Sequence, residues 1–286
     1  MRNMIRSFLY TIAFLFLKIN FFKKIFKFLA NIYLIDIGYC ADWEFLKNKS
    51  QNNLFQGENI FVSKFDLLNV RNCIDVGSNI GEYSLEILKN LKTNVIAFEP
   101  MSDCDEYLKK IHNKYGIRFS YYLYALSNKN SEDIIYFGAS TGGLSTIEKS
   151  VNEIDYLKKN NVNSMKIEKK MLDSYLDNKN FNNIDFIKID VEGHEFKVLE
   201  GGMNFINKHK VKLIQIEFNI HHLYVGNSIL QFSKKLKNYV VTQMNLINGK
   251  LVVVDEESFL SNIYQLSNFV FIEKEFFDKN KKFLLN

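Results

Sequence analysis

The fold of this chain follows from residues 73–81, CIDVGSNIG, and residues 95–100, VIAFEP. In the first stretch an apolar strand ends at Asp75, and glycines then let the backbone turn tightly and approach a ligand. The second stretch is a strand that ends in a carboxylate, Glu99, at the interval expected within one nucleotide-binding βαβ unit. An ionised carboxylate at that position can accept both hydroxyls of a ribose. The pair therefore predicts a site for a nucleoside cofactor.

Composition restricts the classes of protein to which the chain can belong. With 286 residues, of which 47% are hydrophobic, it can form one large domain with a sizeable core. Its formal net charge of +5 is not accompanied by the aromatic and arginine pattern of a nucleic-acid module, so no nucleic-acid partner is expected. The three cysteines are far apart and odd in number, which supports neither a disulfide framework nor a zinc site. We therefore expect a protein of the reducing cytoplasm.

The first 35 residues carry lysines and arginines but no acidic side chain. The apolar run from Phe8 to Leu17 is too short to span a bilayer, and on a helix the basic residues would occupy about a third of the circumference. This pattern predicts either a helix on an anionic membrane surface, with residues 1–30 contacting the inner face of the membrane, or a helix packed on the domain. We accordingly divide the chain into a basic amphipathic segment, residues 1–40, and a main domain, residues 41–286.

Apolar runs and amphipathic stretches alternate after residue 70, as in a mostly parallel sheet with helices on both faces. Parallel strands are expected near residues 72–76, 94–98, 117–124, 184–190 and 211–217. Helices are expected between them and after them, near residues 80–90, 101–115, 194–207 and 227–238. The pair Asn248-Gly249 predicts a hairpin of residues 239–247 and 250–254, and residues 269–272 supply one more strand. The fold class is therefore α/β, with antiparallel C-terminal strands that complete the sheet.

Residues 131–172 form an insertion between the third and fourth parallel strands. Residues 133–137 and 165–171 are strand-like and flank a loop of small residues, 140–146. This loop could be an active-site lid or an ordinary hairpin connection. Of the two, we favour the hairpin connection.

The glycine segment also favours one type of cofactor. The segment has two glycines, Gly77 and Gly81, where the dinucleotide-binding fingerprint has three. A strand-to-helix turn can also need glycine for its backbone geometry alone, without binding a cofactor. Asp75 at the strand end and Glu82 at the helix start would repel a diphosphate, but they suit a ligand that carries an ammonium and a sulfonium. S-adenosylmethionine has both groups.

The densest polar cluster in the sequence lies at residues 190–195. Asp190, Glu192 and His194 lie where a buried strand leaves the sheet, at the carboxyl edge where open α/β sheets bind ligands, while Glu195 is interpreted as a helix cap. Glu217 ends the next strand and would face the same crevice if the two strands are neighbours. Asp190 and Glu217, with a histidine, could hold Mg²⁺ as hard oxygen ligands. We interpret His221 and His222 as ordinary loop residues.

Five motifs, in order, resemble the FkbM-type S-adenosylmethionine-dependent methyltransferases. They are residues 74–84, 97–100, 125–127, 171–173 and 187–195, and the resemblance spans roughly residues 70–220. It implies a Rossmann-like class I methyltransferase fold, with a mostly parallel seven-stranded sheet, and O-methylation of sugars or other hydroxylated natural products. Ser78 stands where alanine is common in the family, and Met171 where threonine is common.

The resemblance also implies which residues bind the cofactor. Its motifs would line the methionine end of S-adenosylmethionine with Gly77, Ser78, Asn79 and Gly81, the ribose with Glu99, and the adenine with Met101, Ala125 and Leu126. The same motifs add Asp75, Tyr83 and Pro100 to this set.

Transfer of a methyl group to a hydroxyl needs a nearby base or Lewis-acidic metal, because a sugar hydroxyl is a poor nucleophile until it begins to lose its proton. The candidate catalytic residues are Asp190, Glu192, His194 and Glu217. We expect His194 or Asp190 to be the base, and Glu217 to orient the acceptor or to bind a divalent metal such as Mg²⁺. The predicted function is O-methylation of a sugar or glycan precursor, for example of a capsule or lipopolysaccharide.

Two other classes of protein share part of this pattern. A nucleotide- or NAD-binding sugar oxidoreductase or epimerase would use the same first βαβ unit, but it should show a third glycine and a Tyr-x-x-x-Lys pair, and residues 107–111 do not place that pair correctly. A non-catalytic membrane-surface partner of a glycan-assembly complex would keep the fold and lose turnover.

Overall fold

The computed structural model describes residues 56–138, 141, 143–175, 178, 182–246 and 248–285. The basic segment predicted at residues 1–40, with its membrane contact, lies outside the described residues. In the part of the chain that is described, every helix is too short or too polar to cross a bilayer.

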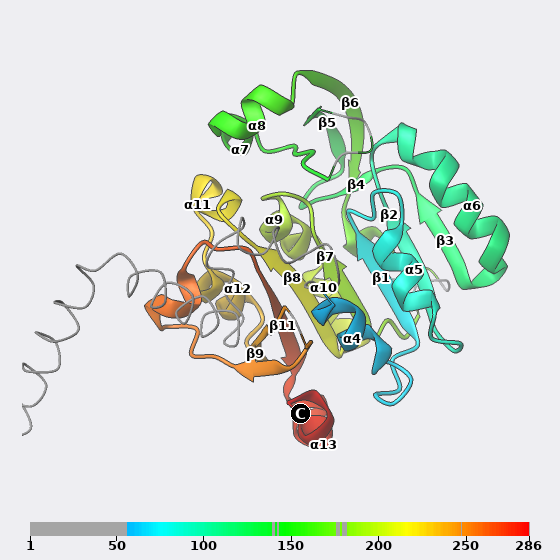
Figure 1. The fold of residues 1–286 in the computed structure, drawn as a ribbon, viewed down its shortest axis with the longest axis vertical. Helices are drawn as coiled ribbons and strands as arrows, with labels where there is room; N and C mark the ends of the chain where they lie inside the picture. Colours follow the sequence, from blue (N-terminus) through cyan, green and yellow to red (C-terminus); the bar gives the residue numbers. More distant parts are fainter. Residues whose placement is uncertain are drawn as a thin grey trace, which may run out of the picture.

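An eight-stranded sheet forms the centre of the domain (Figure 1). Its parallel strands are β1 (Asn72–Val76), β2 (Asn94–Phe98), β3 (Phe119–Tyr122), β7 (Phe186–Ile189) and β8 (Leu213–Phe218). Its antiparallel strands are β9 (Tyr239–Met244), β10 (Leu251–Val253) and β11 (Ser267–Glu273). The order across the sheet is β10-β9-β11-β8-β7-β1-β2-β3. The mostly parallel sheet with antiparallel C-terminal strands is confirmed. All eight strands lie where strands were expected from the sequence, although the expected fold class is seven-stranded.

Helices cover both faces of this sheet, because successive residues of each strand point to opposite sides. Cys73 of β1 packs in one core and its neighbour Ile74 in the other. The first core is covered by α4 (Gly57–Ser63), α5 (Glu82–Leu88), α6 (Asp105–Tyr115) and α13 (Lys274–Leu284). The second is covered by α9 (Glu195–Glu200), α10 (Met203–His209) and α12 (Ile229–Lys235). Short 3-10 turns are η1 (Ser102–Cys104), η2 (Gly116–Arg118), η3 (Leu172–Tyr175) and η5 (Phe259–Asn262).

Several element boundaries differ from those expected. β3 begins only after η2, and the expected helix at residues 194–207 is two helices, α9 and α10. The break lies at Gly201, where a Cβ would come within 1.9 Å of the carbonyl oxygen of Ser127, so the chain passes too close to its neighbour for one continuous packed helix. The expected hairpin is present, but a loop at residues 245–250 replaces the two-residue turn, and the Asn245 N–H donates to the Lys250 carbonyl.

The insertion builds a second, three-stranded sheet. β5 (Ser131–Phe137) pairs antiparallel with β6 (Asn163–Lys170), which also pairs with β4 (Ala125–Leu126). The two expected strands are thus confirmed. The connection between them carries α7 (Lys149–Asn152) and α8 (Asp155–Asn160), so our preference for an ordinary hairpin connection was wrong. The reason is physical: Val151, Ile154 and Leu157 form a small core of their own, which orders the segment.

The Gly77→Ala substitution tests the packing at the carboxyl end of β1. Gly77 has a φ of 79°, and a Cβ there would lie 1.9 Å from the carbonyl oxygen of Asp190. We expect the substitution to lower the free energy of unfolding by about 3 kcal/mol or more, measured by urea denaturation, since backbone strain and a backbone clash add. Gly226→Ala is the matched control, because Gly226 is also left-handed but has open space around it, and it should cost about 1 kcal/mol. Equal losses in the two variants would contradict the assigned clash.

Candidate active site

A pocket opens at the carboxyl edge of β1, β2 and β7. The empty space in it, including the part open to solvent, is about 760 Å³. Seven predicted cofactor-binding residues line it: Gly77, Asn79, Glu99, Pro100, Met101, Ala125 and Leu126. Three predicted catalytic residues line it as well: Asp190, Glu192 and His194. The insertion contributes Gly143, Ser145 and Ile147, so the small-residue loop forms part of the pocket wall.

Glu99 is fixed in this pocket by backbone hydrogen bonds. Its Oε2 accepts from the Asn79 N–H at 2.8 Å, and its Oε1 accepts from the Met101 N–H at 2.9 Å. Burial raises the pKa of Glu99 to about 7, although these two N–H groups act in the opposite direction. Each carboxylate oxygen keeps a further lone pair for a ligand hydroxyl.

The other predicted cofactor-binding residues lie beside the pocket. Ser78 and Tyr83 line an adjoining cavity, which shares Gly77, Asn79 and Asp190 with the first. Gly81 begins α5 and packs against α6. Asp75 lines neither cavity: it is fully buried and accepts a 2.6 Å hydrogen bond from the Ser84 hydroxyl.

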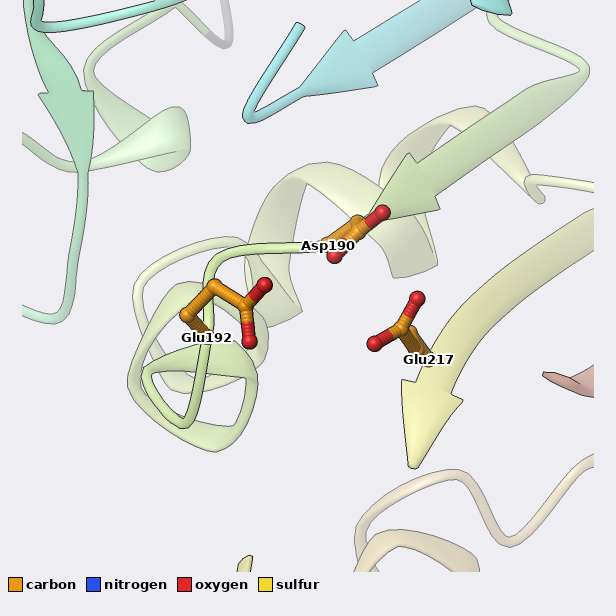
Figure 2. Close-up of side chains that lie close together, drawn as sticks. All are labelled: Asp190, Glu192 and Glu217. Carbon is orange, nitrogen blue, oxygen red and sulfur yellow. The ribbon is translucent and has the colours of Figure 1, made fainter. Parts of the chain in front are cut away.

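Three carboxylates lie close together (Figure 2). Two of them, Asp190 and Glu192, line the pocket, and Glu217 lies beside them without lining it. Asp190 follows β7, Glu192 follows two residues later, and Glu217 lies near the end of β8. One oxygen of each lies within 4.8 Å of the others. Because β7 and β8 are paired neighbours, the predicted proximity of Asp190 and Glu217 is confirmed. Burial, followed by the charge of Asp190, raises the pKa of both Glu192 and Glu217 well above the usual range.

A buried lysine lies under this cluster and was missed by sequence reasoning. Lys188 of β7 has its Nζ 2.7 Å from Asp190 Oδ2 and 4.7 Å from the centre of the Tyr83 ring. Burial lowers the pKa of Lys188, but the carboxylates of Asp190, Asp75 and Glu58 outweigh it, so the pKa lies above its ordinary value. The signal in the sequence was a lysine inside an otherwise apolar strand, because such a lysine is seldom buried without an acidic partner.

His221 and His222 are not loop residues, contrary to our interpretation. Both are buried on α11 (His221–Val225), where each has a carboxylate partner. His221 Nδ1 lies 2.7 Å from Glu192 Oε2, and His222 Nε2 lies 3.1 Å from Glu195 Oε2. The Glu195 side chain binds the turn before its helix, since its Oε1 accepts the N–H groups of residues 191 and 193, and His194 occupies the N-cap position without a capping side-chain hydrogen bond.

His194 is held at both ring nitrogens. Nδ1 lies 2.5 Å from Glu148 Oε1 and Nε2 lies 2.9 Å from the Ser127 hydroxyl. Burial lowers the pKa of His194, against the effect of Glu148. Neither nitrogen can take a substrate proton without a change of partner, so Asp190 is the better candidate for the base. Ser127 and Glu148 were not singled out from the sequence, because 46 or more residues separate each of them from His194.

The family model described as the methyltransferase FkbM domain matches residues 75–241, which is more than half of the chain. This chain belongs to the FkbM methyltransferase family. It is therefore an enzyme that transfers methyl groups from S-adenosylmethionine. None of the curated proteins matches it.

Solved structures of other methyltransferases show weak similarity to this FkbM methyltransferase. An rRNA methylase from Streptococcus thermophilus is 14% identical, with a TM-score of 0.39 over 75% of this chain and 96% of that one. TrmK of M. capricolum, in complex with S-adenosyl-homocysteine, is 14% identical, with a TM-score of 0.38 over 74% and 67%. The O-methyltransferase TomG from Streptomyces achromogenes, in complex with SAM, is 8% identical, with a TM-score of 0.40 over 85% and 96%. Values this low say nothing of the substrate of this chain.

The pocket of this FkbM methyltransferase fits S-adenosylmethionine. A buried carboxylate, Glu99, is suited to the ribose, and the apolar side chains of Ala125 and Leu126 are suited to the adenine. No lysine or arginine occurs among the described residues that line the pocket, so it lacks the usual counter-charge for a diphosphate, whereas Asp190 and Glu192 suit a positively charged ligand.

Cofactor affinity should depend on pH through Glu99. Only its ionised form accepts hydrogen bonds from both ribose hydroxyls, and with a pKa of about 7 this form falls from about 90% at pH 8 to about 10% at pH 6. We expect S-adenosylhomocysteine to bind about tenfold more weakly at pH 6 than at pH 8, measured by isothermal titration calorimetry. Glu99→Gln should bind weakly at both values, while Glu106→Gln, at an exposed position on α6, should behave as the wild type. A pH dependence that survives in Glu99→Gln would rule out this assignment.

Proposed function

We propose that this methyltransferase acts on a hydroxyl of a sugar or glycan precursor, such as a capsule or lipopolysaccharide unit. The observation that supports this acceptor most is the group of three carboxylates, Asp190, Glu192 and Glu217, at the edge of the cofactor pocket (Figure 2). Carboxylates are strong hydrogen-bond acceptors with no competing donor, and neighbouring hydroxyls are what a carbohydrate presents.

S-adenosylmethionine, when bound, supplies a methyl group on a positively charged sulfur. The contribution of the protein is then to hold the acceptor oxygen in line with that methyl group and to take its proton. We assign proton removal to Asp190, whose Oδ2 is fixed by Lys188 and whose Oδ1 remains to face the acceptor. The hydroxyl O–H bond breaks as the new O–C bond forms and the C–S bond breaks, and Asp190 passes the proton to water.

Glu217 and Glu192 orient the acceptor in this proposal. Glu217 Oε1 accepts a hydrogen bond from the Asn219 side chain at 2.9 Å, which fixes the carboxylate near Asp190. Glu192 has a φ of 54°, and its backbone carbonyl accepts from the Thr146 hydroxyl of the insertion at 2.7 Å. Both carboxylates are therefore held in place before an acceptor binds, which lowers the entropic cost of orienting its hydroxyls. Residues 1–30 would keep the enzyme at the inner membrane face, where such precursors are assembled.

Comparison of surface glycans from cells with and without the gene tests the acceptor. Mass spectrometry should show that a glycan fragment loses one methylene when the gene is deleted and regains it when the wild-type gene is restored. A gene that encodes Asp190→Asn should not restore it. Unchanged glycan masses, together with no methyl transfer to a panel of nucleotide sugars by the purified protein, would overturn the proposal. Cofactor binding without transfer to any acceptor would favour the non-catalytic partner.

Substitutions at the pocket should separate catalysis from cofactor binding. We expect Asp190→Asn and His194→Ala to lower kcat at least tenfold, because they remove the proton acceptor and a positioned part of the pocket wall respectively. S-adenosylhomocysteine affinity, measured by calorimetry, should change little in either variant. Asp103→Asn, at an exposed position, serves as the control. Unaltered turnover in both pocket variants would remove these two residues from the mechanism.

A further inference from the structure

We infer that Asp190, Glu192 and Glu217, together with His221, form a binding site for one hard divalent cation, Mg²⁺ or Mn²⁺. The site would lie at the edge of the cofactor pocket. The inference concerns the same three carboxylates as the proposed function, but it does not depend on the identity of the methyl acceptor.

The spacing of the ligand atoms suits a single ion. One oxygen of each carboxylate lies within 4.8 Å of the others (Figure 2). Two oxygens that share an ion at about 2.0–2.4 Å can be at most about 4–5 Å apart, so all three can reach the same ion. They come from the end of β7, the turn after it and β8, so the fold itself brings them together.

His221 provides the second, independent observation. It is only 2% exposed, and its Nδ1 points at the cluster, 2.7 Å from Glu192 Oε2. The two buried atoms are within ion-pair distance of each other, but neither makes a hydrogen bond. A buried polar atom is ordinarily hydrogen-bonded, because leaving it unpaired costs about 1–3 kcal/mol. With its proton on Nε2, His221 has a lone pair on Nδ1, as Glu192 Oε2 has, and two ligands at adjacent positions around a Mg²⁺ ion are separated by about 3 Å.

Three of the four proposed ligands, His221, Glu217 and Asp190, also make a hydrogen bond to a residue outside the cluster. Tyr156 on α8 places its hydroxyl 2.5 Å from His221 Nε2, which leaves Nδ1 for the cluster. Asn219 donates to Glu217 Oε1, and Lys188 donates to Asp190 Oδ2. Such outer partners are typical of metal sites, since they fix the tautomer of a histidine and the direction of a carboxylate. A group of acidic residues on a surface would not have them.

The charges favour an ion of charge +2. In the described part of the chain, Lys188 is the one lysine or arginine in ion-pair contact with the three carboxylates. If all three carboxylates are ionised, the one ammonium leaves two net negative charges in a largely buried volume, which is costly unless a cation is bound. Oxygen-rich ligand sets select Mg²⁺ and Mn²⁺ over softer metals. A cation bound here would be held by Asp190 itself, so the cation, and no longer the free carboxylate, would then activate the acceptor oxygen.

Cation binding can be measured directly on the full chain. The protein is treated with EDTA, desalted and titrated with MnCl₂, with binding followed by the loss of the free Mn²⁺ electron paramagnetic resonance signal. MgCl₂ is then added as a competitor. We expect one Mn²⁺ per chain, displaced by Mg²⁺. Glu217→Gln and Glu192→Gln should each weaken binding at least tenfold, and Tyr156→Phe about tenfold through the histidine. Glu132→Gln, at an exposed position on β5, should bind as the wild type.

Each variant is checked by circular dichroism and by S-adenosylhomocysteine affinity, so that a misfolded variant is recognised; if the glutamine variants misfold, Tyr156→Phe and His221→Asn carry the test. Absence of Mn²⁺ binding at millimolar concentration, or equal binding by all variants and the control, overturns the inference. Glycan methylation that proceeds in EDTA, with no Mn²⁺ bound, would overturn the cation site and leave the proposed function standing. Cation binding without glycan methylation would overturn the proposed function and leave the cation site standing.

Discussion

The site depends on the close approach of two backbone segments, the turn after β1 and the turn after β7. The Cα of Gly77 lies so near Asp190 that a Cβ there would come within 1.9 Å of its carbonyl oxygen, and the Asp190 N–H donates to the Val76 carbonyl. The first turn carries residues predicted to bind the cofactor, and the second carries Asp190 and Glu192 of the acidic cluster. Their contact joins the two functions in one pocket, and only a residue without a side chain permits it.

Buried charge is the second constraint on this structure. Lys188, Asp75 and Glu58 lie below the pocket, and their charges favour the ammonium of Lys188 more strongly than burial opposes it. Neutral groups complete the network, because Gln215 accepts from the Tyr83 hydroxyl and donates to Glu58. A network of this kind contributes little to stability compared with an apolar core of the same volume. We infer that it is kept because it fixes Asp190 at the pocket.

The sequence predicted the cofactor half of the pocket better than the acceptor half. The bounds of β1 and β2 are those expected, because short apolar runs between turn residues are typical of strands buried on both faces. Glu99 could be assigned because the carboxylate follows its strand directly. By contrast, α4, α11 and α13 were not predicted. Short helices, and a helix at the end of the chain, contain too few turns to show a clear hydrophobic periodicity.

The acceptor half was missed for a different reason. Glu148 and Tyr156 lie on or beside helices of four and six residues, and their partners, His194 and His221, are 46 and 65 residues away in the chain. Local pattern cannot reveal such contacts, because they arise only when the insertion folds back over the carboxyl edge of the sheet.

The insertion therefore supports the side of the pocket at which we propose that the acceptor binds. It holds the turn at residues 191–194 from outside through three contacts: Thr146 to the Glu192 carbonyl, Glu148 to His194, and Tyr156 to His221, which adjoins Glu192. Glu99 and the glycine turn, in contrast, are held by the backbone of β2 and of the residues around it. The insertion nevertheless reaches the glycine turn as well, because the Asn79 side chain donates to the Thr141 carbonyl at 3.3 Å, so a change in the insertion would affect both sides of the pocket.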